Sequence, residues 1–143
     1  MINIDGQYGG GQILRTALSL SMITGKGFRM KNIRGQRKKC GLMRQHLTCV
    51  EAAAEISNAS VRGAGVGSTQ LSFVPEKVAA GKYHFRIGTA GSTSLLAQTL
   101  IPALLQADGD SQVILEGGTH NPLAPSASYL QQIFLGGYKE SAH

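Results

Sequence analysis

The feature that most constrains the fold is a pattern that occurs twice in the chain. An apolar strand, a glycine-rich turn and a helix of 3.6-residue periodicity begin near Ile2 and begin again near Tyr83. In both copies this strand, turn and helix are followed by a second strand, a loop and a second helical pattern. Repetition at this scale indicates two copies of one small supersecondary unit. We therefore predict an α/β (α+β) protein of repeated units, each a four-stranded sheet backed by two helices.

Apolar spacing places the elements of both copies. In the first copy it predicts strands over 2–4, 28–33 and 71–74 and at Val61, and helices over 13–23 and 42–56. In the second copy it predicts strands over 83–87 and 112–115, a loop over 117–125, and helices over 95–107 and 126–134. The predicted units are residues 1–80 and 81–135, of which the second is incomplete because its last two strands are missing. Residues 136–143 form a polar tail outside the pattern.

Composition excludes several classes of protein. The chain is 42% hydrophobic and 15% charged, which is typical of a globular protein and too apolar for a disordered one. It holds no apolar run of about 18 residues, so no membrane span is expected, and its first residues do not form a secretory signal. The two cysteines, Cys40 and Cys49, make no disulfide framework, so we expect a cytoplasmic protein.

The net charge of +6 is unevenly distributed. Eight basic residues lie between Lys26 and Arg44, with no acidic residue among them. A segment this one-sided is typical of a surface that binds phosphates or nucleic acid. The alternative is a solvated basic loop, which is common in proteins of many functions.

Two glycine-rich turns are candidates for an anion site. Gly9, Gly10 and Gly11 lie between a predicted strand and a predicted helix, and residues 88–92 take the same position in the second copy. Glycine amides can approach an anion closely, and a helix N-terminus adds a favourable dipole. The spacing is neither a Walker nor a dinucleotide motif, so turns with a purely structural role are the alternative.

Arginines near the first turn supply planar forks that suit bidentate contact with phosphate. Arg34 and Arg37 lie in the basic loop, Arg44 follows it, and Arg15 lies one helical turn beyond the glycines. His46, in the next helix, is a base, a phosphate donor or a buried structural residue. His84 and His143 have no partner visible in the sequence, whereas His120 lies in the loop over 117–122 and is a candidate to line a site. The scattered acids do not form an acid/base pair.

Together these motifs resemble the RNA 3′-terminal phosphate cyclase family. The resemblance covers residues 2 to 134 almost continuously. The matching residues are Ile4-Asp5-Gly6, Gly9-Gly10-Gly11-Gln12-Ile13-Leu14-Arg15, Ile33-Arg34, Arg37, Gly41-Leu42, Gln45-His46-Leu47, Ile87-Gly88-Thr89-Ala90-Gly91-Ser92, Gln98-Thr99, Pro102, Gly117-Gly118-Thr119, Asn121-Pro122 and Ala124-Pro125.

The resemblance implies an enzyme that uses ATP and a divalent metal, Mg or Mn. Such enzymes adenylate a histidine, pass AMP to an RNA 3′-phosphate, and let the neighbouring 2′-hydroxyl displace AMP, which leaves a 2′,3′-cyclic phosphate. It also implies that Gln98 lies along the nucleotide cleft and that Pro125 stacks on the adenine. For the phosphate or RNA site we hypothesise the residues Gly9, Gly10, Gly11, Arg15, Arg34, Arg37, Gln45 and His46.

The sequence departs from the family pattern in several places. The Gly-Glu pair that the family carries ahead of its three glycines is missing, because Tyr8 runs directly into Gly9, and Cys40 stands where the family has proline. The family's inserted small domain and nucleophilic histidine would lie beyond residue 143. We therefore expect a truncated member, without a catalytic residue of its own and inactive alone.

Two other functions remain open at this stage. One is a non-catalytic cyclase-like protein that binds RNA in ribosomal RNA processing, and the other is a generic phosphate-binding module. The expected partners are RNA with a 3′-phosphate end and ATP. An incomplete second sheet also predicts self-association through its exposed edge.

Overall fold

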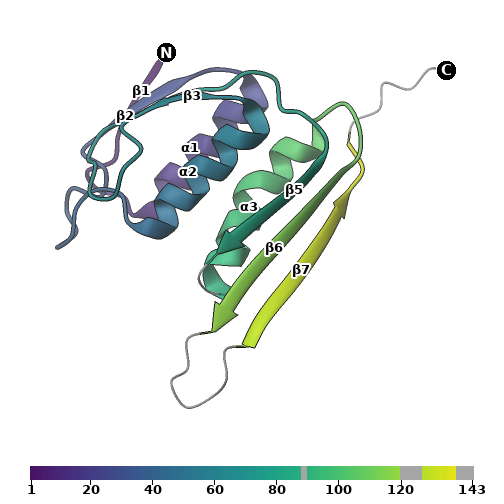
Figure 1. Ribbon diagram of the computed structural model, residues 1–143. Coiled ribbons are helices and arrows are strands. Elements are labelled where there is room, and N and C mark those ends of the chain that lie inside the picture. The colour runs from purple at the N-terminus through teal and green to yellow at the C-terminus, as the bar shows by residue number, and fades with distance from the viewer. Residues whose placement is uncertain (88–89, 120–126, 138–143) are drawn as a thin grey trace.

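Amphipathic helices and alternating strands must each bury one apolar face, and here they do so in three layers. The computed structural model describes residues 1–87, 90–119 and 127–137. Two sheets lie on opposite sides of a layer of three helices, which pack against one another (Figure 1). The helices are α1 (Gly11–Thr24), α2 (Arg44–Ser57) and α3 (Ala90–Leu105).

The first sheet has four strands in the order β1-β2-β4-β3. β1 pairs parallel with β2, and the other two pairings are antiparallel. Along β2, Phe28 and Met30 are buried while Arg29 and Lys31 are exposed, so one face of the sheet covers the helices and the other meets solvent. The strands are β1 (Ile2–Asp5), β2 (Phe28–Lys31), β3 (Ser60–Arg62) and β4 (Leu71–Val74).

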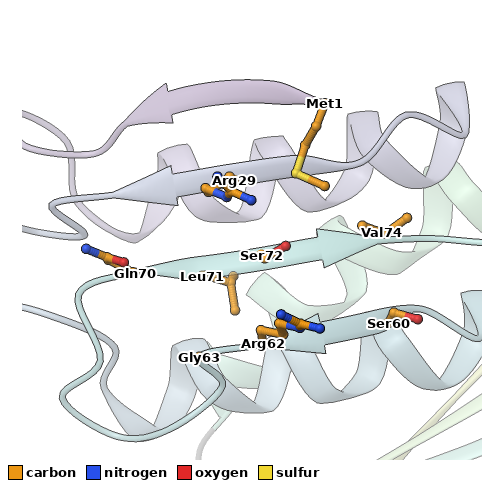
Figure 2. A pocket seen from close by; sticks show the side chains of 9 residues that line it. All are labelled: Met1, Arg29, Ser60, Arg62, Gly63, Gln70, Leu71, Ser72 and Val74. Atoms are coloured by element: carbon orange, nitrogen blue, oxygen red, sulfur yellow. The ribbon is translucent and has the colours of Figure 1, made fainter.

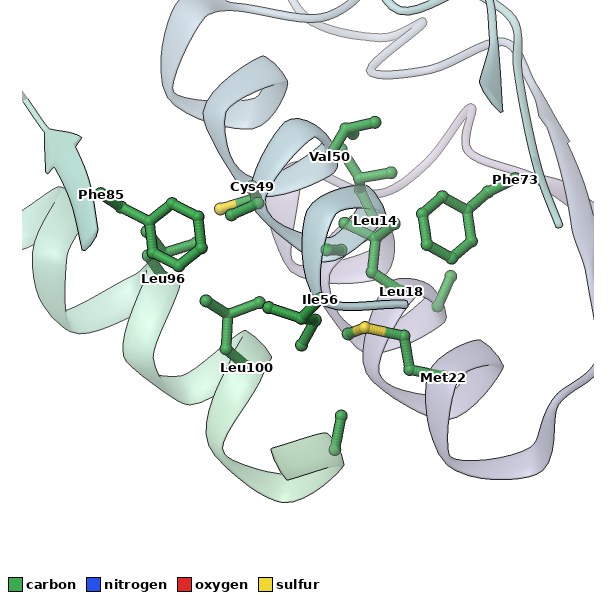
Figure 3. Packing of buried hydrophobic residues seen from close by; sticks show 14 of the residues in the cluster. Leu14, Leu18, Met22, Cys49, Val50, Ile56, Phe73, Phe85, Leu96 and Leu100 are labelled. Carbon is green, nitrogen blue, oxygen red and sulfur yellow. The ribbon is translucent and has the colours of Figure 1, made fainter. Parts of the chain in front are cut away.

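The core lies between the helices and the inner faces of the sheets (Figure 3). Phe28 and Phe73, from β2 and β4, stack with ring centroids 5.7 Å apart. The helices α1, α2 and α3 fill the centre with fully buried apolar side chains, among them Leu14, Leu18, Val50, Ile56, Leu96 and Leu100. Ser19 Oγ donates a hydrogen bond of 2.6 Å to the Thr99 carbonyl oxygen, which joins α1 to α3.

The second sheet has three strands among the described residues, in the order β5-β6-β7. β5 pairs parallel with β6, as β1 does with β2, and α3 connects them as α1 connects β1 to β2. The predicted α/β class with repeated units is therefore confirmed, and the repetition is clearest in these β-α-β halves. The strands are β5 (Lys82–Ile87), β6 (Ser111–Thr119) and β7 (Ala127–Leu135).

The helix predicted over 126–134 is wrong, because this segment forms β7. Leu130 and Phe134 would share one face of such a helix, but in the structure both side chains face solvent, 55% and 71% exposed. β6 is paired with β5 on one side only, and β7 satisfies the backbone groups of its other side in nine-residue antiparallel register. β7 thereby takes the place beside β6 that β4 takes beside β2. The loop predicted over 117–125 is also corrected, because β6 continues to Thr119.

The remaining elements agree with the sequence patterns to within a few residues at their ends, except that α3 begins at Ala90, within the glycine-rich turn predicted over 88–92 and ahead of the predicted start at Leu95. Gly25, the predicted C-cap of α1, adopts the left-handed conformation with φ of 75° and donates its N–H to the Ser21 carbonyl at 2.8 Å. In the part of the chain that the structure describes, none of the helices combines the length and apolar character needed to cross a bilayer. Self-association through an open sheet edge stays a prediction.

Candidate functional site

The candidate site is built around the glycine turn, Gly9–Gly11, which joins β1 to α1. The Gln7 N–H donates to Asp5 Oδ1 at 2.9 Å, and the Gly9 N–H donates to the Gly6 carbonyl at 3.3 Å, so the chain reverses tightly before the helix begins. Gly10 is the N-cap of α1, and no side chain caps this end. The first N–H groups of the helix are therefore directed toward any anion bound there.

Three basic or polar side chains lie against this turn and explain why it contains glycine. A Cβ on Gly10 would lie 3.0 Å from Nη2 of Arg37. A Cβ on Gly11 would lie 2.8 Å from Nη1 of Arg15 and would overlap Nε2 of His46. The structure thus brings Arg15, Arg37 and His46 together, although they come from α1, the basic loop (residues 34–41) and α2.

Hydrogen bonds hold the basic loop beside the glycine turn. The Gln36 N–H donates to the Gln7 carbonyl at 3.1 Å, which joins the two segments. Arg34 adopts a left-handed backbone with φ of 52°, and its Nη1 donates to the carbonyls of Lys39 at 2.6 Å and Gly41 at 3.1 Å. One nitrogen of the Arg34 fork is therefore used to close the loop, a structural role that the sequence did not predict.

His46 is buried, with 4% of its surface exposed. Burial, together with the charges of Arg34 and Arg15, lowers the pKa of His46 to about 4, so the ring is neutral at pH 7. Its Nδ1 accepts a hydrogen bond of 3.0 Å from the Met43 N–H. In a neutral imidazole the proton must then be on Nε2, which is the nitrogen that faces Gly11. His46 therefore presents a hydrogen-bond donor to the site.

A groove between α1 and α3 is lined by Gln12 and Arg15 from the first turns of α1. Arg15 Nη2 donates to Gln12 Oε1 at 3.2 Å, which orients the guanidinium one helical turn back. Arg15 and Gln98 both line a cavity of about 280 Å³ between α1 and α3. The structure therefore puts the nucleotide-site candidate Gln98 on the same groove as one of the phosphate-site candidates.

Other candidates from the sequence lie elsewhere. Gln45 is exposed at the second position of α2, and its side chain makes no hydrogen bond with the described residues. Pro125, His120 and His143 lie outside the described residues, as do the first two residues of the second glycine-rich turn. His84 has a partner that the sequence did not reveal, since its Nε2 lies 3.0 Å from Glu116 Oε2 on the second sheet.

The described residues do not offer a protein-held metal site. No group of three or more His, Cys, Asp or Glu side chains in these parts of the chain could hold a metal ion. A divalent ion at the glycine turn would need its oxygen ligands from a bound phosphate and water. The residues present therefore fit an anion.

Sequence reasoning missed two groups that shape the site. Gln12 orients Arg15, and its i, i+3 position on the same helix was a signal that could have found it. The Met43 N–H sets the proton position on His46. A backbone donor leaves no mark in the sequence, so this second role could be seen only in the structure.

Comparison with known proteins agrees with the motifs. The family described as RNA 3′-terminal phosphate cyclase matches residues 6–141. A protein of that name from Ectopseudomonas mendocina is 59% identical over 134 residues, which are 94% of this chain and 39% of the relative. Those from Pseudomonas fluorescens and Koribacter versatilis are 56% and 57% identical, again over 94% of this chain. The chain spans about two fifths of the length of these relatives.

Proposed function

The chain belongs to the RNA 3′-terminal phosphate cyclase family, and from this we propose that its glycine turn binds the phosphorylated 3′ end of an RNA strand. The reaction that we propose for the whole protein is ATP-dependent conversion of that end to a 2′,3′-cyclic phosphate. The observation that carries the proposal is the convergence of Arg15, Arg37 and His46 on the N-terminus of α1.

The arrangement suits a terminal phosphate in charge and in hydrogen bonding. Arg37 is exposed beside Gly10 and can offer two parallel N–H groups to phosphate oxygens. His46 adds a neutral Nε2–H, and α1 adds its uncapped first N–H groups. A terminal phosphate carries more negative charge than a phosphodiester, so this set of donors favours a phosphorylated end over a hydroxyl end.

Cyclisation requires the phosphate to be held while one bond forms and another breaks. The 2′-oxygen attacks phosphorus as the bond to the AMP oxygen breaks, so that AMP leaves with that oxygen and the 2′-hydroxyl proton passes to water. ATP supplies the AMP group when it is bound. Arg15 and Arg37 would hold the phosphate oxygens and balance their charge during the displacement. The groove that holds Gln98 supports a nucleotide position next to Arg15, and we propose that Pro125 stacks on the adenine there.

The state of His46 favours a binding role for this part of the chain. A nucleophile needs a free lone pair, whereas Nδ1 of His46 already accepts a hydrogen bond and Nε2 carries the proton. This supports, as the second candidate function, a module that recognises RNA ends without forming a covalent adenylate itself.

The test compares two RNA oligonucleotides that are identical except for a 3′-phosphate or a 3′-hydroxyl end. We expect the chain to bind the 3′-phosphate RNA more tightly than the 3′-hydroxyl RNA. We expect Arg37→Ala to weaken binding of the 3′-phosphate RNA by about tenfold or more, because a charge-assisted hydrogen bond is lost. Arg37→Lys should recover only part, because the planar fork is lost.

The matched control is Arg86→Ala, which removes an exposed arginine from the second sheet, where it pairs with Glu116 at 3.1 Å. We expect it to bind both ends like the unmodified chain. Equal binding of the two ends by the unmodified chain would contradict the proposal and favour a generic phosphate-binding module.

A further inference from the structure

A polar row crosses the outer face of the first sheet, away from the helices. Asn3 pairs with Arg29, Arg29 pairs with Ser72, and Ser72 pairs with Arg62, so the four residues form one row over all four strands. Their strand neighbours Phe28, Met30, Leu71 and Phe73 are buried. Because strand side chains alternate between faces, this outer row points to solvent. Figure 2 shows Arg29, Ser72 and Arg62 on the side of the sheet opposite the helices.

Arg29, Ser72 and Arg62 of the outer row line a shallow hollow of about 500 Å³. The residues that line it include Arg29 and Arg62 with the polar side chains of Ser60, Gln70 and Ser72, and none of them is acidic. In the part of the chain that the structure describes, neither arginine makes a hydrogen bond or ion pair. Two such guanidinium groups, in one hollow whose lining includes no acidic residue, favour an anionic ligand.

The spacing of the two arginines suits a ligand with repeated charges. They lie on β2 and β3, which are separated by β4, so their backbones are roughly 10 Å apart, twice the distance between neighbouring strands. Two separate phosphates of an extended strand fit this distance better than one phosphate does. The lining residues include no aromatic side chain, so contacts with a nucleic acid would be to its backbone and not to its bases.

One basic residue, Lys31, lies between the outer row and the segment that leads from β1 into the glycine turn. Lys31 shares the outer face of β2 with Arg29 and lies at the end of the strand, where its carbonyl accepts the Gly6 N–H at 2.8 Å. Asp5 is the acidic residue beside Lys31 in the register, and its Oδ1 accepts hydrogen bonds from the Gln7 N–H and from Asn32. The positive charge of Lys31, Arg29 and Arg62 therefore exceeds the negative charge on this face.

We propose that the outer row binds the backbone of single-stranded RNA upstream of its 3′ end, with Arg29 and Arg62 each contacting a phosphate. This inference rests on the proposed function, because it extends the path of an RNA whose 3′ end lies at the glycine turn. It gives the chain affinity that increases with RNA length and does not depend on base sequence.

The experiment measures the affinity of the chain for a trinucleotide and for a twelve-nucleotide RNA, each with a 3′-phosphate or a 3′-hydroxyl end, over a range of salt concentrations. We expect Arg29→Ala with Arg62→Ala to weaken binding of the long RNA by roughly tenfold and to leave the trinucleotide unaffected. The slope of log K against log salt should become shallower by about 0.7 for each lost phosphate contact. The paired lysine variant, Arg29→Lys with Arg62→Lys, should keep the slope, and Arg86→Ala is the control for loss of a surface charge.

The outcomes separate this inference from the proposed function. Binding of the long RNA no tighter than the trinucleotide, or a long-RNA slope unchanged in the double alanine variant, overturns the outer-row proposal. Length-dependent binding with no preference for the 3′-phosphate supports the outer row and contradicts the proposed end site. Circular dichroism spectra that match the unmodified chain confirm that the exposed arginines were removed without unfolding.

Discussion

Substitution of Gly11 by alanine tests the geometry of the site most directly. The new Cβ would overlap Nε2 of His46, whose ring is buried and held by the Met43 N–H, and would lie 2.8 Å from Nη1 of Arg15. Arg15 can move because its side chain is long and only half-buried. His46 must move as a whole, which loses its hydrogen bond, worth about 1 kcal/mol, and adds an overpacking cost of about 1–3 kcal/mol.

A gain opposes this cost, because alanine is favoured over glycine within a helix by about 1 kcal/mol. The net expectation is a decrease of about 1–3 kcal/mol in the free energy of unfolding. Urea denaturation followed by circular dichroism measures it. Gly81→Ala is the matched control, because a Cβ there meets no atom within 4 Å, and it should change stability by less than about 0.5 kcal/mol.

The decisive measurement is the double variant Gly11→Ala with His46→Ala. Removing the imidazole removes the overlap, so the alanine at position 11 should then cost nothing or stabilise slightly. The coupling energy between the two positions should be about 2–4 kcal/mol, the sum of the lost hydrogen bond and the overpacking cost. Additive effects of the two substitutions would show that His46 does not lie against Gly11, and the description of the site would be wrong.

Three further predictions concern the same region. The pKa of His46 is lowered to about 4, against 6.5 in the unfolded chain, so the unfolded state binds the extra proton first as the pH falls. The free energy of unfolding should therefore decrease between pH 6.5 and pH 4. His46→Asn should flatten this part of the plot of stability against pH. Arg34→Ala removes the two hydrogen bonds that close the basic loop, so trypsin should cut at Lys38 and Lys39 several times faster, while Arg86→Ala should leave the rate unchanged. Incubation with labelled ATP should leave no covalent label on His46.

Local sequence patterns predicted most of the helices and strands, because the burial of one apolar face depends on residues within the same element. The alternation in residues 28–31 and the helical periodicity from Ile13 to Ile23 each specify one apolar face, and the structure buries that face. The prediction of a helix over 126–134 was wrong because the structure of this segment depends on a distant part of the chain. Its apolar spacing is compatible with a helix, but the unpaired side of β6 offers nine residues of antiparallel pairing, and no local pattern reports that opportunity.

The candidate site also has features that the sequence predicted and features that depend on the folded structure. Residue type alone indicated that Arg15, Arg37 and the glycines could hold an anion, and the structure brings these groups together. Arg34 could not be distinguished from Arg37 in the sequence, because its role in closing the loop depends on a left-handed backbone and on the positions of two carbonyls.

The expected absence of label on His46 follows from where its single proton lies. A nitrogen attacks phosphorus through a lone pair, and a neutral imidazole has one such nitrogen. In His46 that nitrogen is Nδ1, which accepts the Met43 N–H at 3.0 Å on the side of the ring away from Gly11. Attack through Nε2 would need the proton to move to Nδ1, which would break this hydrogen bond and leave two N–H donors facing each other in a buried place. Label that is retained after denaturation and lost in His46→Ala would show that the ring makes this exchange. Unlabelled protein that binds the RNA 3′-phosphate, with weaker binding in His46→Ala, would support His46 as a donor to the phosphate.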